Sequence, residues 1–190
     1  MRVRDAETSI YHGLLELPWP RYLSAMWIVC GELQSLYWGW LNDGDKELVA
    51  ETMDVVRQVV IAGKSPEATR DAKKLARAWG RLSQSSRADE ASAGLENAWM
   101  TFEALAQEIS GICGQYDGAN WVTNAATERW RVYPPDFEGP IVEDPNEETD
   151  DAGPMAQTLA LFERIVTKVA EAQGPDLDPA SLRAQIFAQP

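Results

Sequence analysis

Two carboxylates one helical turn apart are the residues of this chain best spaced to do chemistry. Glu51 and Asp54 occupy positions i and i+3 of the segment Glu51-Thr52-Met53-Asp54, so that on a helix both side chains lie on one face. Carboxylate oxygens are the ligands that magnesium prefers, and a magnesium ion held by several of them can neutralise the phosphates of a nucleotide. The pair therefore raises the hypothesis of metal-assisted phosphate chemistry.

A complete site of this kind needs a second pair of carboxylates, which the neighbouring segment does not supply. All-helical nucleotide pyrophosphohydrolases hold magnesium with an E-x-x-E motif on one helix and an E-x-x-D motif on the next. The preceding apolar segment carries Glu32, but the residues one turn away from it are Val29 and Ser35. We interpret Glu51 and Asp54 as carboxylates on a solvated helix face, and a magnesium-dependent nucleotide pyrophosphohydrolase remains the alternative function.

The other candidates for catalysis or metal binding are isolated in the sequence. His12 is the only histidine, which excludes sites built from several histidines, and no spacing pairs it with a nucleophile. The alternating acidic residues from Asp144 to Asp150 lack the glycine and the late glutamate of a calcium loop. Cys30 and Cys113 lie in apolar helical patterns without metal-ligand spacing and are predicted to be reduced core residues. We expect no catalytic residue, no cofactor and no metal site.

Any functional side chain must be positioned by the stretch from Leu14 to Leu41, which carries four of the eight tryptophans. A helix that begins after Pro18 and Pro20 places large apolar side chains at three- and four-residue spacing. These are Leu23, Trp27, Cys30, Leu33, Tyr37 and Trp40, with Met26, Val29 and Leu36 widening the face. Because this helix is apolar on nearly all sides, we expect it at the centre of the fold. Its Glu32 should lie at the rim or pair with a cation such as Arg21.

The rest of the chain predicts further helices around this axis. Periodic apolar residues predict long helices at about 46–62, 66–82, 95–113 and 155–173, and shorter helices before Pro18 and at 120–130 and 178–187. Asp43 or Asp45, Ser65-Pro66 and Asp178-Pro179 mark helix starts, and Gly63 marks a helix end. The valine-rich segment 55–62 leaves a β-strand as the alternative there.

The predicted fold class is all-α. We expect one domain over residues 1–190, built as a bundle of about five long helices with additional short ones. The segment at about 132–153 is rich in proline, glycine and acidic residues and is predicted to be a long acidic loop.

Charge is distributed unevenly along the chain. Its 30 acidic and 17 basic residues give a net charge of −13, which repels nucleic-acid phosphates and anionic membranes and favours a basic partner. Residues 64–87 form a basic segment, whereas residues 136–190 contain twelve acidic and three basic residues. We interpret the basic segment as facing acidic residues of the same molecule, with nucleic-acid binding as the alternative. We expect neither a nucleic acid nor a membrane as partner.

No segment predicts secretion or membrane insertion. The N-terminal MRVRDAETS has no apolar run behind its basic residues and therefore does not fit a signal peptide. The uncharged part of the tryptophan-rich stretch, residues 22–31, is far shorter than the ~20 residues that a membrane span needs. Together with the reduced cysteines, these features predict a soluble cytoplasmic protein.

The segment LPWPRYLSAMWIVCGEL, followed by the turn Asn-Asp-Gly-Asp and a second apolar helix, resembles helical immunity proteins of bacterial polymorphic-toxin systems. The resemblance covers residues 14–62 and carries over no functional residue by position. It implies a non-catalytic protein that neutralises a cognate bacterial toxin by occluding a basic surface or active site. The implied partner is that toxin or another basic protein domain. A homodimeric helical adaptor or regulator is a further alternative.

Under this resemblance, the late acidic residues and the aromatic residues near them are the predicted partner-binding set. Complementary charge accelerates encounter, and buried aromatic side chains supply most of the lasting affinity. The set is Trp121, Trp130, Tyr133, Asp136, Phe137, Glu138, Glu143, Asp144, Glu147, Glu148, Asp150 and Asp151. The same composition is typical of a disordered, solubilising loop, which stays open as the alternative.

Overall fold

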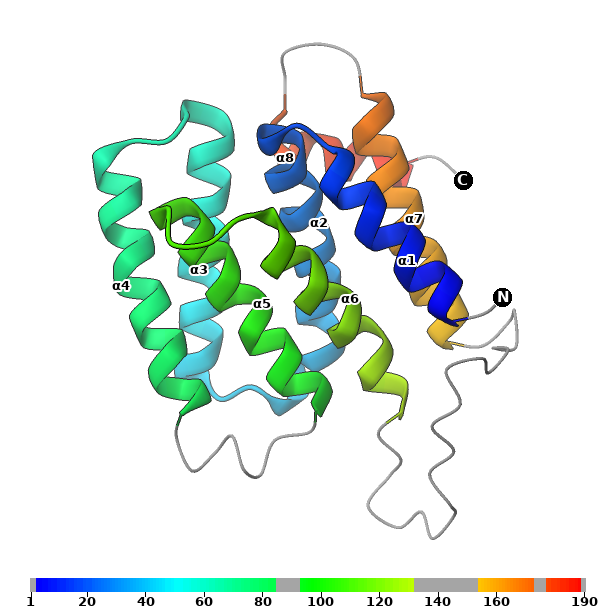
Figure 1. Cartoon of the computed structure of the whole chain (residues 1–190), viewed down its shortest axis with the longest axis horizontal. Coiled ribbons are helices and arrows are strands. Elements are labelled where there is room, and N and C mark those ends of the chain that lie inside the picture. The colour runs from blue at the N-terminus through cyan, green and yellow to red at the C-terminus, as the bar shows by residue number, and fades with distance from the viewer. Residues whose placement is uncertain (1–2, 85–92, 132–153, 173–176, 189–190) are drawn as a thin grey trace, which may run out of the picture.

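The computed structural model describes residues 3–84, 93–131, 154–172 and 177–188, and the structural statements below refer to these residues (Figure 1). They form helices and no β-strand, which confirms the all-α prediction. In chain order the helices are α1 (Val3–Glu16), α2 (Trp19–Tyr37), the 3-10 helix η1 (Trp38–Trp40), α3 (Asp43–Ala62), α4 (Pro66–Ser83), α5 (Ala93–Ser110), α6 (Gln115–Arg131), α7 (Pro154–Glu171) and α8 (Pro179–Ala188). The predicted loop at about 132–153 lies outside the described residues.

The expected count of five long helices is not confirmed, because two helices predicted to be short are longer. Helix α1 has 14 residues and α6 has 17 residues. The buried face of α6 consists largely of small side chains, including Ala119, Ala125 and Ala126. Alanine favours a helix and lets two helices approach closely, but it gives little signal to a search for large apolar residues.

Helix α2 is the buried axis of the fold. It contacts α1, α3, α5, α6, α7 and α8, and ten of its nineteen residues are buried. Leu23, Met26, Cys30 and Leu33 are fully buried, as predicted, and a fully buried side chain of this size contributes roughly 1.5–3 kcal/mol relative to an exposed one. Ser24, a polar residue of the same helix, is also buried, and its hydroxyl donates to the carbonyl of Leu177 (2.8 Å).

The start and end of α3 are fixed by local hydrogen bonds. Asn42, rather than Asp43 or Asp45, is the N-cap: its side-chain oxygen accepts from the Asp45 amide (2.8 Å), and the Asp45 carboxylate accepts from the Asn42 amide. The valine-rich segment 55–62 is helical and not a strand. The helix ends at Gly63, as predicted, where φ is +79°, a conformation that glycine adopts without steric cost.

Helix α4 forms one edge of the molecule and packs against α3 and α5 (Figure 1). Ser65 caps its start as predicted, since the hydroxyl oxygen accepts from the Ala68 amide (3.0 Å). The buried Trp79 stacks on Phe102 of α5, with ring centroids 5.4 Å apart, and its indole nitrogen donates to the Thr52 hydroxyl of α3 (3.0 Å). One side chain therefore joins three helices.

Helix α5 ends earlier than the sequence predicted. The amide of Ile112 donates to the Gln107 carbonyl (2.9 Å) across Gly111, whose φ is +80°, and this is the Schellman arrangement that ends a helix. The predicted extension of the helix to Cys113 is therefore wrong. Ile112, which lies within the predicted helix 95–113, is 65% exposed, because the chain reverses before that residue can continue the apolar face.

Ion pairs and helix-end contacts attach α7 and α8 to the rest of the fold. Arg21 donates to the carbonyls of Val169 and Ala170 in the last turn of α7 (3.1 and 2.7 Å), where a cation is favoured by the helix dipole. The cation that pairs with Glu32 is consequently not Arg21 but Arg183 of α8 (2.6 Å).

The predicted cap of α8 is confirmed. The carboxylate of Asp178 accepts from the Ala180 amide (3.2 Å) and also from Arg57 of α3 (2.9 Å). None of the described helices is both long enough and apolar enough to span a membrane.

Gly118 of α6 contacts both α2 and α5 in the interior of the fold. The Tyr22 hydroxyl of α2 donates to Glu108 Oε1 of α5 (2.9 Å), and the Gly118 amide donates to the same oxygen (3.3 Å). A Cβ atom on Gly118 would lie 2.5 Å from the tyrosine oxygen and 2.6 Å from Oε1. The close contact of α2, α5 and α6 therefore requires glycine at this position.

We predict that Gly118→Ala lowers the free energy of unfolding by about 1–3 kcal/mol, because the added methyl group overpacks this junction. Gly31→Ala on α2 is the matched control, since a Cβ there meets no atom within 4 Å, and it should be neutral or stabilising by up to about 1 kcal/mol. Urea unfolding followed by circular dichroism measures both. Equal effects of the two substitutions would contradict the packing described here.

Candidate functional site

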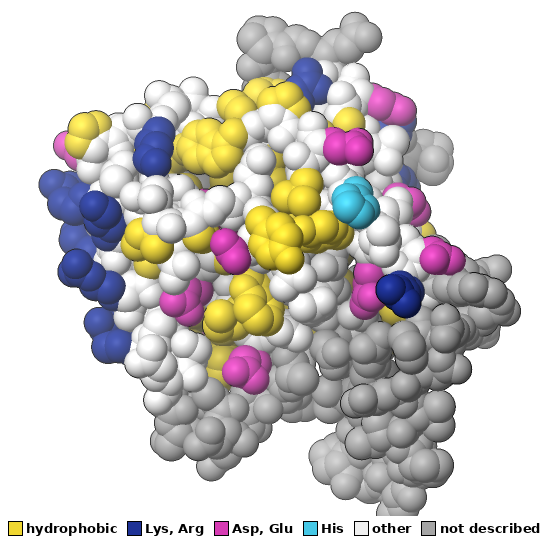
Figure 2. Space-filling view, viewed as in Figure 1, with side chains coloured by type: hydrophobic (Ala, Val, Ile, Leu, Met, Phe, Trp, Pro, Cys, Tyr) yellow, Lys and Arg dark blue, Asp and Glu magenta, His cyan; other side chains and the backbone are white. Residues whose placement is uncertain are grey.

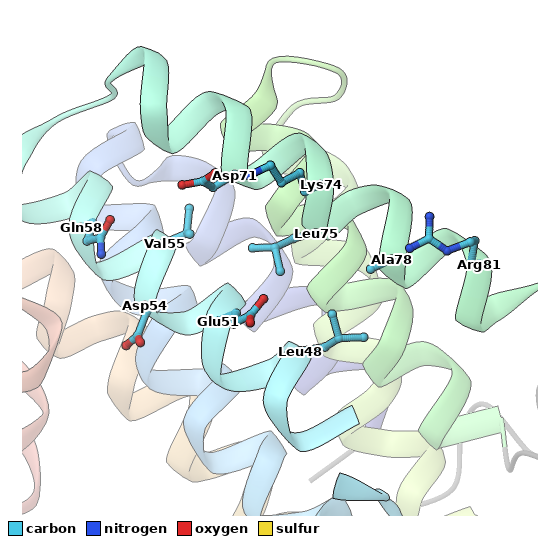
Figure 3. A pocket seen from close by; sticks show the side chains of 10 residues that line it. All are labelled: Leu48, Glu51, Asp54, Val55, Gln58, Asp71, Lys74, Leu75, Ala78 and Arg81. Atoms are coloured by element: carbon cyan, nitrogen blue, oxygen red, sulfur yellow. Dashed lines mark hydrogen bonds and ion pairs between the residues drawn. The ribbon is translucent and has the colours of Figure 1, made fainter. Parts of the chain in front are cut away.

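A groove of about 460 Å³ lies between α3 and α4 (Figure 3). Helix α3 contributes one wall and α4 the other. The lining residues are Leu48, Glu51, Asp54, Val55, Gln58, Asp71, Lys74, Leu75, Ala78 and Arg81. The groove therefore contains both carboxylates of the E-x-x-D segment that the sequence singled out.

The floor of this groove is apolar and its rims are charged. Leu48, Val55 and Leu75 lie between the two helices, and Leu75 is buried to 5% exposure (Figure 3). Glu51 points from α3 towards α4, whereas Asp54 lies on the outer side of α3. Both carboxylates are exposed. The arrangement offers apolar contact area flanked by groups that can form charge-assisted hydrogen bonds.

The two walls carry opposite charge and are not joined by ion pairs. The cations of the α4 wall are Lys74 and Arg81, and Lys74 pairs with Asp71 on its own helix (3.0 Å). The hydrogen bond from Lys74, with the nearby Arg70, holds the pKa of Asp71 below its usual value. Within the described part of the chain, no ion pair includes Glu51 or Arg81. Their charges remain accessible to a partner.

The carboxylates required by the magnesium hypothesis do not converge. Glu51 and Asp54 share the groove, but Glu32 is held by Arg183 at α8. Among the described residues, no three His, Cys, Asp or Glu side chains are close enough together to bind one metal ion. The described residues of the groove thus bring Glu51 and Asp54 together without the further carboxylates that this hypothesis requires.

Most of the predicted partner-binding residues lie outside the described part of the chain. Trp121 is half-buried on α6. Trp130 lies in the last turn of α6, and its side chain is not described. The others fall within residues 132–153: Tyr133, Asp136, Phe137, Glu138, Glu143, Asp144, Glu147, Glu148, Asp150 and Asp151. The structure therefore does not test whether these residues form one surface, and the partner-binding set stays a prediction.

A second polar cluster, which the sequence analysis missed, is buried at the junction of α2, α5 and α6. Glu108 is 4% exposed, and its Oε2 has no hydrogen-bond partner in the described part of the chain. Burial raises the pKa of Glu108 to about 8, although the hydrogen bonds from Tyr22 and Gly118 partly oppose the shift. The available signal was its position one turn after Leu105 on the buried face of α5.

The ionisable side chains around Glu108 have raised pKa values, although Cys113 is only half-buried, against its prediction as a core residue. Burial raises the pKa of Tyr22 well above its usual value and raises the pKa of Cys113 to about 12, with Glu108 adding to both shifts. Cys30 is fully buried, and burial likewise raises its pKa. Thiols held in the protonated form are poor nucleophiles. None of these four side chains lines the groove between α3 and α4.

Comparison with known protein families, with curated proteins and with solved structures finds no match to this chain. The interpretation of the groove accordingly depends on its own geometry and chemistry.

We predict that the buried Glu108 makes the free energy of unfolding decrease as the pH rises from 4.5 to about 8. Because its folded pKa of about 8 lies above the ordinary value of 4.5, the folded chain retains a proton that the unfolded chain has lost between these two pH values. The stabilisation is complete below pH 4.5 and decreases towards pH 8, by on the order of 1 kcal/mol per pH unit.

The variant Glu108→Gln should flatten this pH dependence, since the amide keeps the acceptor for Tyr22 and cannot ionise. Urea unfolding across the same pH range measures the slope. Glu96→Gln, at an exposed position of the same helix, should leave the slope as it is. Identical slopes for Glu108→Gln and the unaltered chain would disprove the assignment.

Proposed function

We propose that this chain is a non-catalytic protein-binding module that neutralises a basic protein domain, in the manner of an immunity protein against a bacterial toxin. The observation that carries the proposal is the groove between α3 and α4, in which the exposed carboxylates of Glu51 and Asp54 border an apolar floor. Such a surface suits a protein segment better than a small metabolite, because it is long, open and only partly apolar.

The partner segment expected here is an amphipathic helix or an extended loop. Its apolar side chains would cover Leu48, Val55 and Leu75, which supply most of the lasting affinity. Its Lys or Arg side chains would meet Glu51 and Asp54, and an arginine could bind either carboxylate through two hydrogen bonds. This is the helix-in-groove mode of recognition, with charge fixing the orientation.

The charge of the whole chain supports the same kind of partner. A net charge of −13 attracts a basic domain over distances longer than any single contact and accelerates association. We propose that the predicted acidic loop at about 132–153, with its eight carboxylates between Asp136 and Asp151, adds to this long-range attraction.

The resemblance to immunity proteins agrees with the position of the groove. It covers residues 14–62, which include α2 and α3, and α3 is the helix that carries Glu51 and Asp54. We propose accordingly that the chain acts in the bacterial cytoplasm and occludes the active site or substrate surface of its toxin.

The two alternatives from other functional classes have less support. A magnesium-dependent nucleotide hydrolase would need Glu32 beside Glu51 and Asp54, and Glu32 is paired with Arg183 instead. A homodimer formed through the tryptophan-rich stretch would need that stretch at the surface, but most apolar residues of α2 are buried in the core, and Trp19, Trp27 and Leu36 are partly buried against it. Trp38, at 44% exposure, is the main exposed apolar residue described there.

We predict that the double substitution Glu51→Lys and Asp54→Lys weakens binding to the proposed toxin partner roughly tenfold, because two attractive contacts become repulsive. Isothermal titration calorimetry measures the affinity, and rescue of growth in cells that express the toxin measures neutralisation.

Glu16→Lys with Glu96→Lys is the matched control. Both residues are exposed and lie outside the groove, and the two substitutions change the net charge by the same amount as those at Glu51 and Asp54. Wild-type affinity of the Glu51 and Asp54 variant would remove this groove from the interface. Hydrolysis of a nucleoside triphosphate that disappears in Glu51→Ala would favour the enzyme alternative.

A further inference from the structure

The outward face of α4 is a strip of positive charge in an otherwise acidic protein. Its five cations are exposed and recur at spacings of three or four residues, which places them on one side of the helix. They are Arg70, Lys73, Lys74, Arg77 and Arg81. Figure 2 shows Lys and Arg side chains gathered along the edge of the molecule that α4 occupies in Figure 1.

This strip borders a second groove, which lies between α4 and α5 and measures about 660 Å³. Lys73, Arg77 and Arg81 line the α4 side, and Glu103 and Gln107 line the α5 side. The groove also has apolar contacts: Ala76 is buried in its floor, and Ile112 borders it with 65% of its surface exposed.

The three cations of this groove form no ion pair with the described part of the chain. Asp71, the acid nearest to them on α4, pairs with Arg70 and Lys74. Across the groove, Glu103 accepts a hydrogen bond from Gln107 (2.8 Å). No ion pair among the described residues includes Lys73, Arg77 or Arg81.

We propose that the groove between α4 and α5 binds an acidic peptide segment of a second partner protein. Carboxylates of that segment pair with Lys73 and Arg77, and an aliphatic side chain packs on Ile112 and Ala76. The site is separate from the groove between α3 and α4. Lys73 and Arg77 do not line that groove, and Glu51 and Asp54 do not line the groove between α4 and α5. The two faces of α4 would then serve two partners of opposite charge.

The chemistry of the groove favours a peptide over a nucleic acid. A duplex binds through many phosphate contacts along an extended basic surface, whereas this strip is one helix wide and stands next to the acidic wall of α3. The net charge of −13 also opposes a polyanion beyond the immediate contact. A short acidic segment with an aliphatic residue uses both the cations and the exposed isoleucine.

The test is a selection from a displayed library of random peptides on the full-length chain. The enriched peptides should be acidic and contain aliphatic residues. Fluorescence anisotropy of one enriched peptide should show roughly tenfold weaker binding to the double variant Lys73→Glu and Arg77→Glu, because two attractive pairs become repulsive. Ile112→Ser should weaken binding several-fold through lost apolar contact.

Two controls separate this site from general charge effects and from the proposed function. Arg4→Glu with Lys168→Glu changes the net charge equally at exposed positions outside the groove and should keep the affinity. The Glu51 and Asp54 double variant should keep it as well, so that failure of the toxin interface does not imply failure here.

The proposal is overturned if no peptides are enriched, or if the enriched peptides are not acidic. It is also overturned if the Lys73 and Arg77 variant binds the peptide with unchanged affinity, or if a short DNA duplex binds as tightly as the peptide. Peptide binding that emerges only after the acids of 136–151 are neutralised would also overturn it, since the chain's own acidic segment would then be the occupant.

Discussion

Helix α2 has almost no polar side, and water must therefore be excluded around most of its circumference. Covering one such helix takes several others, and α1, α3, α5, α6, α7 and α8 all contact it. The few polar groups of α2 are satisfied by different neighbours: Tyr37 donates to the Ala125 carbonyl of α6 (2.7 Å), and Trp27 donates to the Met53 carbonyl of α3 (3.0 Å). These bonds fix the rotation of α2, since buried polar groups are costly without partners. The remaining helices take their positions from it.

The position of α4 follows from this arrangement. Helix α4 packs mainly on α3 and α5, and Trp79 holds it there. Only a narrow apolar stripe of α4 is needed for that contact, so the rest of its circumference can be charged. Its two flanks become the walls of two grooves, one facing the carboxylates of α3 and the other facing the exposed Ile112. Both candidate binding grooves thus result from the packing of α4 against α3 and α5.

Local features of the fold could be predicted from the sequence, and tertiary features could not. Pro18, Ser65 and Asp178 marked helix starts because proline and capping side chains act over a few residues. The end of α5 was missed because Gly111 interrupts an apolar pattern that continues to Cys113. The length of α6 was missed because alanine packs closely without a strong apolar signal. The pairing of Glu32 with Arg183, 151 residues away, depends on how α2 and α8 meet, which no local pattern encodes.

The candidate functional residues were also predictable only where a local pattern revealed them. The spacing of Glu51 and Asp54 was visible in the sequence, but their position across a groove from Lys74 and Arg81 depends on the packing of α3 against α4. Likewise, the basic character of α4 was evident, whereas its exposed side and its groove with α5 were not. The buried Glu108 stood within an apolar pattern, and only the junction with Tyr22 and Gly118 gives it a role.

Zero-length carbodiimide cross-linking of the chain to its proposed toxin partner, followed by mass spectrometry, tests the central proposal most directly, because it joins only carboxylates and amines that are in contact. Binding in the groove between α3 and α4 predicts cross-links from Glu51 or Asp54 to lysines of the toxin. A tight complex in which neither carboxylate is linked or protected from modification would contradict the account.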